Sequence, residues 1–150
     1  MSTEQNKANY HQFIEEAWNK GNLAILDELA SPDLVVHFLP TGTPPGGESM
    51  KRHVESTRAA FPDIRITIED QFSVEDKIVA RFTMTGTQRG PYLNHLKTLL
   101  PPTDKRFSVA GIEIWRFDAD GKWVECWSNL DRLGMLQQLG VIPAPAPSPS

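Results

Sequence analysis

Residues 111–131, GIEIWRFDADGKWVECWSNLD, predict a long β-hairpin that turns at Asp118–Gly121. On the second arm, residues of one parity bring together two indoles, two carboxyls and an amide. These are Trp123, Glu125, Trp127, Asn129 and Asp131. A regular strand places residues of one parity on one face, and a carboxyl beside an apolar wall gains proton affinity because its charged form is desolvated. The hairpin therefore indicates a sheet face suited to acid/base chemistry.

The rest of the chain predicts an α+β fold, with helices laid on an antiparallel sheet. Helical spacing occupies residues 4–20, 22–31, 50–61 and 132–140. Strand patterns occupy residues 33–39, 64–69, 77–87, 106–117 and 122–130. Both faces of the later strands carry apolar residues, so one face is expected to meet the helices and the other a cavity or a partner subunit. The segment 88–105 between two strands is long enough to be a functional loop or a lid with a helical turn of its own.

Composition narrows the class of protein. The chain has 150 residues, 39% hydrophobic and 23% charged, and a formal charge of −4 without a basic stripe. We expect one domain over residues 1–142, a disordered proline-rich tail over 143–150, and no binding of nucleic acid. The single cysteine, Cys126, is expected to be a small buried hydrophobe. The polar N-terminus and the absence of a long apolar run predict a cytoplasmic protein with no membrane span.

No familiar cofactor motif is present. The glycines of TGTPPGG (41–47) lack the Lys-Ser/Thr of a phosphate-binding loop. The four histidines show no metal-ligand spacing, and there is no nucleophile elbow. The sequence thus predicts neither a metal nor a cofactor.

A series of short motifs resembles one family. They are WNKGN (18–22), ELASPDLVVH (28–37), AFPD (60–63), IVARFTMTGT (78–87), PPTDKRFSVAGIEIWRF (101–117) and DGKWVECWSNLD (120–131). In this order, over about residues 5–140, they resemble the SnoaL-like polyketide cyclases, whose fold is the nuclear-transport-factor-2-like cone.

The resemblance implies a cone-shaped α+β barrel, in which a curved antiparallel sheet wraps an apolar pocket closed by the N-terminal helices. It implies cofactor-free aldol ring closure of a polyketide ester and a homodimer through the outer sheet face. The family's acid/base aspartate ends the last strand, where Asp131 stands, and its pocket histidine lies on the first strand, where His37 stands. Trp127 and Asn129 fall at further matching positions.

The chain departs from the family pattern near the long loop. Gln88 replaces a common histidine, YLNHLKTLL (92–100) lengthens the loop, and Asp104 replaces glycine in the PPT motif. These changes bear on the substrate more than on the fold.

Each catalytic candidate has a structural alternative. Asp131 could be the general base, but it directly precedes the last helix, where aspartate is a favoured N-cap. His37 could bind a substrate carbonyl or orient Asp131, or it could be a satisfied buried histidine. Glu113 and Glu125 could face each other, or pair with arginine or lysine on the sheet surface.

The substrate-binding candidates also have alternatives. Arg81 could reach into the cavity or bridge to Glu69. Phe13 and Trp18 could close the pocket, although a helical aromatic stripe is more often plain core. In the long loop the lid candidates are Tyr92, His95 and Leu96.

Three functions remain open. The first is a cofactor-independent cyclase or isomerase acting on an apolar, carbonyl-rich small molecule. The second is an epoxide hydrolase-like enzyme, which requires Asp131, Arg81 and Glu113 or Glu125 to converge around a water. The third is a non-catalytic small-molecule-binding or dimer module, in which the indoles bury against a partner.

Overall fold

The computed structural model describes residues 3–93 and 98–143. The helices are α1 (Thr3–Phe13), the π-helix η1 (Ile14–Asn19), α2 (Ile25–Leu29), α3 (Gly47–Ala60) and α4 (Arg132–Gln138). The strands are β1 (Ala30–Val36), β2 (Arg65–Val74), β3 (Lys77–Thr87), β4 (Tyr92–Leu93), β5 (Leu99–Leu100), β6 (Arg106–Phe117) and β7 (Trp123–Leu130). In these residues, no helix is long and apolar enough to cross a membrane.

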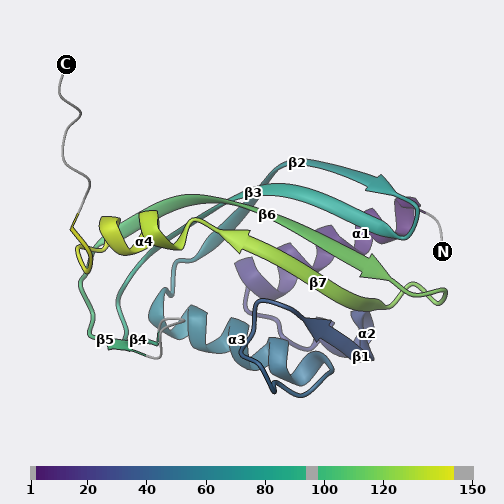
Figure 1. Ribbon diagram of the computed structural model, residues 1–150, viewed down its shortest axis with the longest axis horizontal. Coiled ribbons are helices and arrows are strands. Elements are labelled where there is room, and N and C mark those ends of the chain that lie inside the picture. Colours follow the sequence, from purple (N-terminus) through teal and green to yellow (C-terminus); the bar gives the residue numbers. More distant parts are fainter. Residues whose placement is uncertain (1–2, 94–97, 144–150) are drawn as a thin grey trace.

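One curved sheet organises the molecule. Its order is β1-β7-β6-β3-β2, with β1 parallel to β7 and the other neighbours antiparallel. In Figure 1, α1 lies behind the sheet, α3 lies below it, and α4 follows the end of β7. The predicted α+β fold and curved sheet are confirmed. Within the described residues the sheet does not close into a barrel, because β1 and β2 remain its two edges.

The N-terminal helices cover the inner face of the sheet. The helix predicted over 4–20 is α1 continued by η1, whereas α2 is shorter than predicted. β1 begins at Ala30, earlier than predicted, and its pairing with β7 shifts register between Ala30 and Val35.

Strand β6 shows which residues face inward. Phe107, Val109 and Trp115 are buried, whereas Ile112 between them is 55% exposed. The period of two in the sequence thus separates an inner face, packed on helices, from an outer face.

The hairpin register corrects the opening prediction about β7. Phe117 pairs with Trp123 and Arg116 with Glu125, so Val124 is an extra residue on β7. This bulge reverses the parity of the strand at its start. Trp123 is therefore buried on the inner face, and Glu125 and Trp127 lie on the outer face; the five residues do not share one face.

The bulge builds the aromatic centre of the core. Trp115 and Trp123 stack with ring centroids 3.4 Å apart and planes at 7°. From α1, Tyr10 meets Trp115 edge-on at 4.9 Å, and Phe13 contacts both indoles. Each such aromatic pair adds about 0.5–1.5 kcal/mol beyond the area it buries. The stack therefore fastens α1 to the hairpin.

Gln88 anchors the long loop. Its side chain is fully buried, and its Nε2 donates to the carbonyls of Gly90, Leu100 and Pro101. Its Oε1 accepts a hydrogen bond from Thr103. Inside the loop, β4 and β5 pair as a small ribbon, and the described residues of the loop form no helical turn. His95 and Leu96, predicted as lid residues, lie outside the described residues.

Candidate functional site

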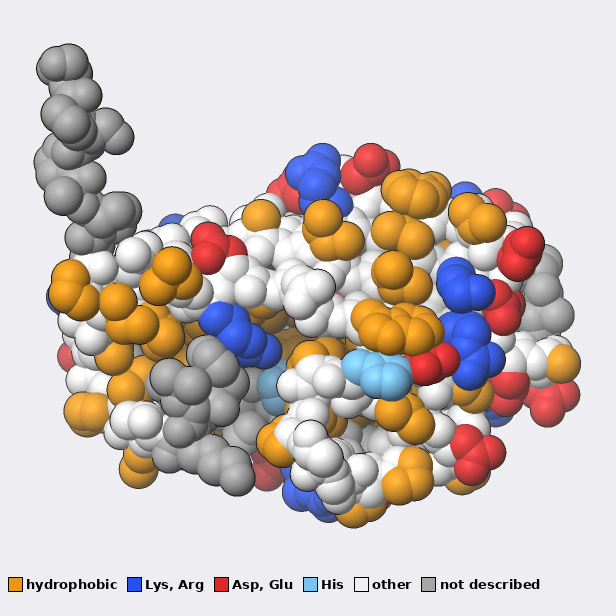
Figure 2. Space-filling view, in the orientation of Figure 1, with side chains coloured by type: hydrophobic (Ala, Val, Ile, Leu, Met, Phe, Trp, Pro, Cys, Tyr) orange, Lys and Arg blue, Asp and Glu red, His pale blue; other side chains and the backbone are white. Residues whose placement is uncertain are grey.

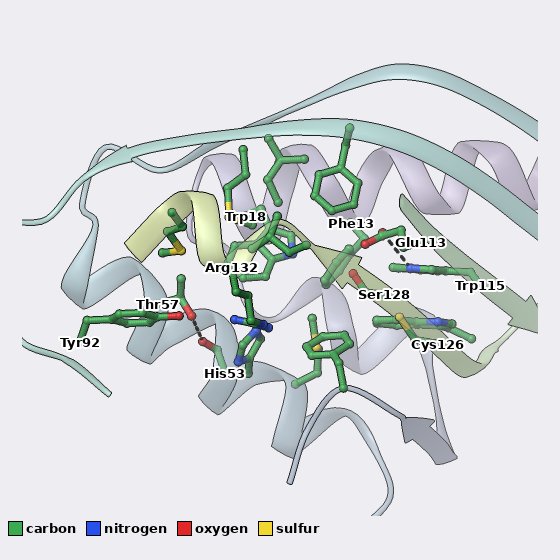
Figure 3. Close-up of a pocket in the computed structure, with 18 residues that line it drawn as sticks. Phe13, Trp18, His53, Thr57, Tyr92, Glu113, Trp115, Cys126, Ser128 and Arg132 are labelled. Atoms are coloured by element: carbon green, nitrogen blue, oxygen red, sulfur yellow. Dashed lines mark hydrogen bonds between the residues drawn. The ribbon is translucent and has the colours of Figure 1, made fainter. Parts of the chain in front are cut away.

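A small pocket lies between the inner face of the sheet, η1, α3 and the start of α4 (Figure 3). Its volume is about 50 Å³. Much of its lining is aromatic or thioether, from Phe13, Trp18, Phe38, Phe82, Met50, Met84 and Met135. The polar lining comes from His53, Thr57, Tyr92, Glu113, Ser128 and Arg132. The pocket thus has a mainly apolar wall with a few separate polar groups, as is usual in small-molecule sites.

Glu113 enters the pocket from β6. Its Oε1 accepts a hydrogen bond from Trp115 Nε1 at 3.1 Å. Burial raises the pKa of Glu113 to about 7, although hydrogen bonds from Tyr10, Trp115 and Ser128 act in the opposite direction. Near neutral pH this carboxyl can therefore both take and return a proton.

Tyr10 stands beside the same carboxyl. Burial, reinforced by the charge of Glu113, raises the pKa of the Tyr10 hydroxyl far above its ordinary value. Tyr10 therefore stays protonated and can serve Glu113 only as a hydrogen-bond donor.

His53 and Arg132 point toward one another on another side of the pocket (Figure 3). The His53 ring, from α3, packs edge-on against Trp18 and Phe38. Burial lowers the pKa of His53 to about 4, and the charge of Arg132 acts in the same direction. At neutral pH His53 is thus an uncharged imidazole beside a cation.

Asp131 does not line this pocket. It is the N-cap of α4, where Oδ1 accepts a hydrogen bond from the backbone N–H of Gly134 at 2.8 Å. The structural alternative weighed for Asp131 is therefore the arrangement seen. With Arg81, Trp127 and Asn129, Asp131 lines an open groove on the outer face of the sheet.

The comparisons with known proteins agree with this architecture. The family model of the SnoaL-like polyketide cyclases matches residues 8–139. The chain belongs to the SnoaL-like polyketide cyclase family. A search of curated proteins gives no match.

Solved structures of similar proteins cover nearly the whole chain. TsrD from Streptomyces laurentii is 28% identical, with a TM-score of 0.83 over 95% of this chain and 99% of its own. AclR from Streptomyces galilaeus, described as a candidate hydroxylase, is 28% identical, with a TM-score of 0.79 over 97% and 87%. IdmH from Streptomyces antibioticus, described as a candidate polyketide cyclase, is 31% identical, with a TM-score of 0.74 over 91% and 99%. These structural similarities support a general cyclase-like function with small-molecule substrates.

In this SnoaL-like chain the predicted site residues divide between two faces of the sheet. Phe13, Trp18, Tyr92 and Glu113 line the interior pocket. Arg81, Trp127, Asn129 and Asp131 line the outer groove. The bulge in β7 places Trp127 and Asn129 on the outer face, because the extra residue shifts the alternation of the strand by one position.

His37 also lies outside the pocket. Its ring stacks on Trp127 with centroids 5.1 Å apart, and its Nε2 lies 2.7 Å from Glu125 Oε2. Arg116 donates to the other oxygen of Glu125 at 2.9 Å. Burial acts to raise the pKa of Glu125, but the hydrogen bonds from His37 and Arg116 outweigh it and hold that pKa below its ordinary value. Glu125 thus pairs with Arg116 and His37 on the sheet surface rather than with Glu113.

The arrangement needed for the epoxide hydrolase alternative is not formed. Arg81 and Asp131 share the outer groove, whereas Glu113 faces the interior pocket. Arg81 does not bridge to Glu69, whose Oε1 accepts instead from Thr83. Glu113 therefore does not converge with Asp131 and Arg81, and Glu125, the other carboxyl considered, is bonded to His37 and Arg116.

The sequence reasoning missed four polar residues of the pocket, His53, Thr57, Ser128 and Arg132. His53 lies between Met50 and Thr57 on the buried side of α3. The sequence pattern assigned Met50 and Thr57 to this helix face but did not include the histidine. Ser128 stands directly opposite Glu113 in the hairpin. Arg132 had no signal of its own, because its direction depends on how α4 begins.

Proposed function

We propose that this chain is a cofactor-independent cyclase or isomerase that acts on an apolar, carbonyl-rich small molecule, with Glu113 as its acid/base group. The proposal moves the acid/base role predicted for Asp131 to the carboxyl that lines the pocket. The observation that carries it is the burial of Glu113 among Trp115, Tyr10 and Ser128, which gives it a pKa of about 7. Positioned groups of this kind accelerate proton transfers by about 10²–10⁴-fold.

The chemistry needs only one carboxyl. As the carboxylate, Glu113 takes a proton from a substrate carbon that lies between two carbonyl groups. The resulting enolate attacks a carbonyl carbon in the same molecule, which forms a carbon–carbon bond and leaves an alkoxide. Glu113 then returns its proton to the alkoxide oxygen, so the enzyme ends as it began.

The pocket has to widen for such a substrate. Ligand pockets usually enclose about 300–1,000 Å³, several times the 50 Å³ seen between these side chains. Met50, Met84 and Met135 line the space, and unbranched thioether chains change rotamer readily. Their flexibility supports a pocket that opens around its ligand.

The test compares two carboxyls on opposite faces of one hairpin. Glu113→Gln removes the proposed acid/base group, and Glu125→Gln is the matched control on the outer face. With a panel of aromatic β-diketo esters as substrates, we expect Glu113→Gln to lower kcat by about 10²-fold or more. We expect Glu125→Gln to remain near the parent rate. Full activity of Glu113→Gln on a turned-over substrate would contradict the proposal.

The outer face of the sheet supports a homodimer. One register row crosses the sheet through Trp127, Ile114, Val79 and Phe72. Phe72 in this row is 54% exposed, and the neighbouring Ile112 is 55% exposed. Figure 2 shows hydrophobic side chains gathered over the strands on this face. Exposed apolar surface of this kind is typical of a subunit interface.

A further inference from the structure

We propose that Arg132 binds an acidic group of the substrate, so that the interior pocket selects a carboxylate or an equally acidic enol over a neutral carbonyl compound. The inference rests on the proposed function for the identity of the pocket as the reacting site. It goes further by giving the substrate a charged end that faces Arg132 and a reacting end that faces Glu113.

Arg132 is the first residue of α4, and its side chain lines the interior pocket and points toward His53 (Figure 3). The neighbouring walls are apolar, from Trp18, Phe38 and Met135. The guanidinium therefore enters a space lined largely by aromatic and thioether groups.

The described part of the chain supplies no counter-charge for Arg132. Within residues 3–93 and 98–143, Arg132 forms neither an ion pair nor a hydrogen bond with another side chain or the backbone. Its neighbour Asp131 turns away to cap α4. A half-buried cation without a carboxylate is costly, because desolvation is not offset by attraction to an opposite charge. An anionic ligand group would supply that charge through two parallel hydrogen bonds.

His53 is uncharged at neutral pH, and the charge of Arg132 helps to keep it so. His53 therefore adds no second positive charge and can give one hydrogen bond to the ligand. The two residues together thus form a site for one negative charge and one neutral acceptor.

The remaining carboxyl of the pocket does not neutralise Arg132. Glu113 Oε1 accepts a hydrogen bond from Trp115 Nε1, and Glu113, Trp115 and Ser128 lie on another side of the cavity from Arg132 (Figure 3). A ligand that spans the pocket can therefore place an acidic group at Arg132 and a carbon acid near Glu113. This geometry favours a β-keto acid or an aromatic acid with a carbonyl side chain.

The experiment uses binding, not turnover, and two probes of the same shape: benzoate and benzamide. Their affinities for the full chain are measured by protein NMR at one ionic strength. We expect benzoate to bind roughly tenfold more tightly than benzamide, which is the difference that one charge-assisted contact provides. Arg132→Gln should abolish this preference, and Arg132→Lys, which keeps the charge, should retain it.

Two controls make the result specific. Arg81→Gln removes an exposed arginine of the outer groove and should leave the preference intact. Glu113→Gln should also bind benzoate preferentially, because the charge lies at Arg132; a loss of turnover in that variant with retained benzoate binding separates the two proposals. The His53 pKa, read from its ring signals, should rise in Arg132→Gln from about 4 toward 6.5.

Three results would overturn the proposal. The first is equal binding of the two probes, or binding of neither. The second is a preference for benzoate that survives in Arg132→Gln. The third is a preference lost in Arg81→Gln and kept in Arg132→Gln, which would place the anion in the outer groove.

Discussion

Asp131 and Arg132 are neighbours in the chain, yet their side chains serve opposite sides of the fold. Asp131 caps α4 beside the outer groove, and Arg132 lines the interior pocket. The backbone turns from β7 into α4 between them, so consecutive side chains diverge. The acid that the family resemblance places at the reacting centre is thus held at a helix end, and the adjacent cation faces the pocket.

The cap makes a direct prediction for Asp131. Asp131→Asn should leave both stability and turnover near the parent values, because asparagine caps helices as well as aspartate does. Asp131→Ala should lower the free energy of unfolding by about 1 kcal/mol, again with little change in kcat. Urea unfolding and initial rates measure the two effects. A large fall in kcat for Asp131→Asn with unchanged stability would restore Asp131 as the acid/base group.

Glu113 should make the protein less stable as the pH rises. Its folded pKa is about 7 and its ordinary value is 4.5, so the folded state holds the proton more tightly. The stabilisation is complete below pH 4.5 and is lost as the pH rises through 7, by about 3 kcal/mol in all. Glu113→Gln should therefore be more stable than the parent at pH 8 and similar to it at pH 4.5.

The control for this prediction is Glu125→Gln. The folded pKa of Glu125 is lowered, so its loss should destabilise the protein at neutral pH instead. Urea titrations at several pH values give both comparisons. A Glu113→Gln stability curve parallel to the parent curve would mean that the buried carboxyl does not titrate near 7.

His53 should produce the opposite pH dependence. Its folded pKa is about 4 against an ordinary 6.5, so the unfolded chain takes up the proton first. The stability present above pH 6.5 is lost as the pH falls toward 4, by about 3 kcal/mol. His53→Gln should flatten this acid branch, whereas the exposed His11, replaced in the same way, should not. Thermal unfolding between pH 4 and 7 distinguishes the two variants.

Strand periodicity explains what the sequence could predict of this fold. In β6 the alternation of Phe107, Val109 and Trp115 with Ile112 separates inner from outer positions, because a strand without a bulge has a period of two. The same rule failed in β7, since the extra residue Val124 leaves no mark in the pattern of side chains. Because of this single bulge, the sequence prediction placed Trp127 and Asn129 on the wrong face.

The interior site could be predicted only in part. Glu113 lies on the inward parity of β6, so its place in the pocket follows from the strand. The state of His53 does not follow from α3 alone, because Trp18 from η1 and Arg132 from α4 set its surroundings. Such contacts join segments far apart in the chain, which local patterns do not report.

The apolar row on the outer face predicts the oligomeric state. Ile114→Lys places a charge in the middle of the row between Val79 and Trp127 and should convert a dimer to a monomer. Val74→Lys is the matched control, since Val74 is 56% exposed at the β2–β3 hairpin, outside the row. Sedimentation equilibrium measures the mass. A parent chain that is monomeric, or an Ile114→Lys variant that stays dimeric, would contradict the interface.

Gln88 should contribute more to stability than an exposed glutamine whose side chain also bonds to the backbone. Gln88→Ala leaves the carbonyls of Gly90, Leu100 and Pro101 without their donor, and a buried group that stays unsatisfied costs about 1–3 kcal/mol. Gln138→Ala, the control, removes two backbone hydrogen bonds, both to Ser108, in an exposed place where water replaces them. We expect Gln88→Ala to lose about 3 kcal/mol of unfolding free energy, and Gln138→Ala less than 1 kcal/mol. Hydrogen exchange at Arg89 and Asp104 should quicken in Gln88→Ala alone, because the Gln88 side chain holds together the loop in which Arg89 N–H bonds to Ala60 and Asp104 N–H bonds to the Gln88 carbonyl. Equal losses in the two variants would show that the burial of Gln88 does not set its contribution.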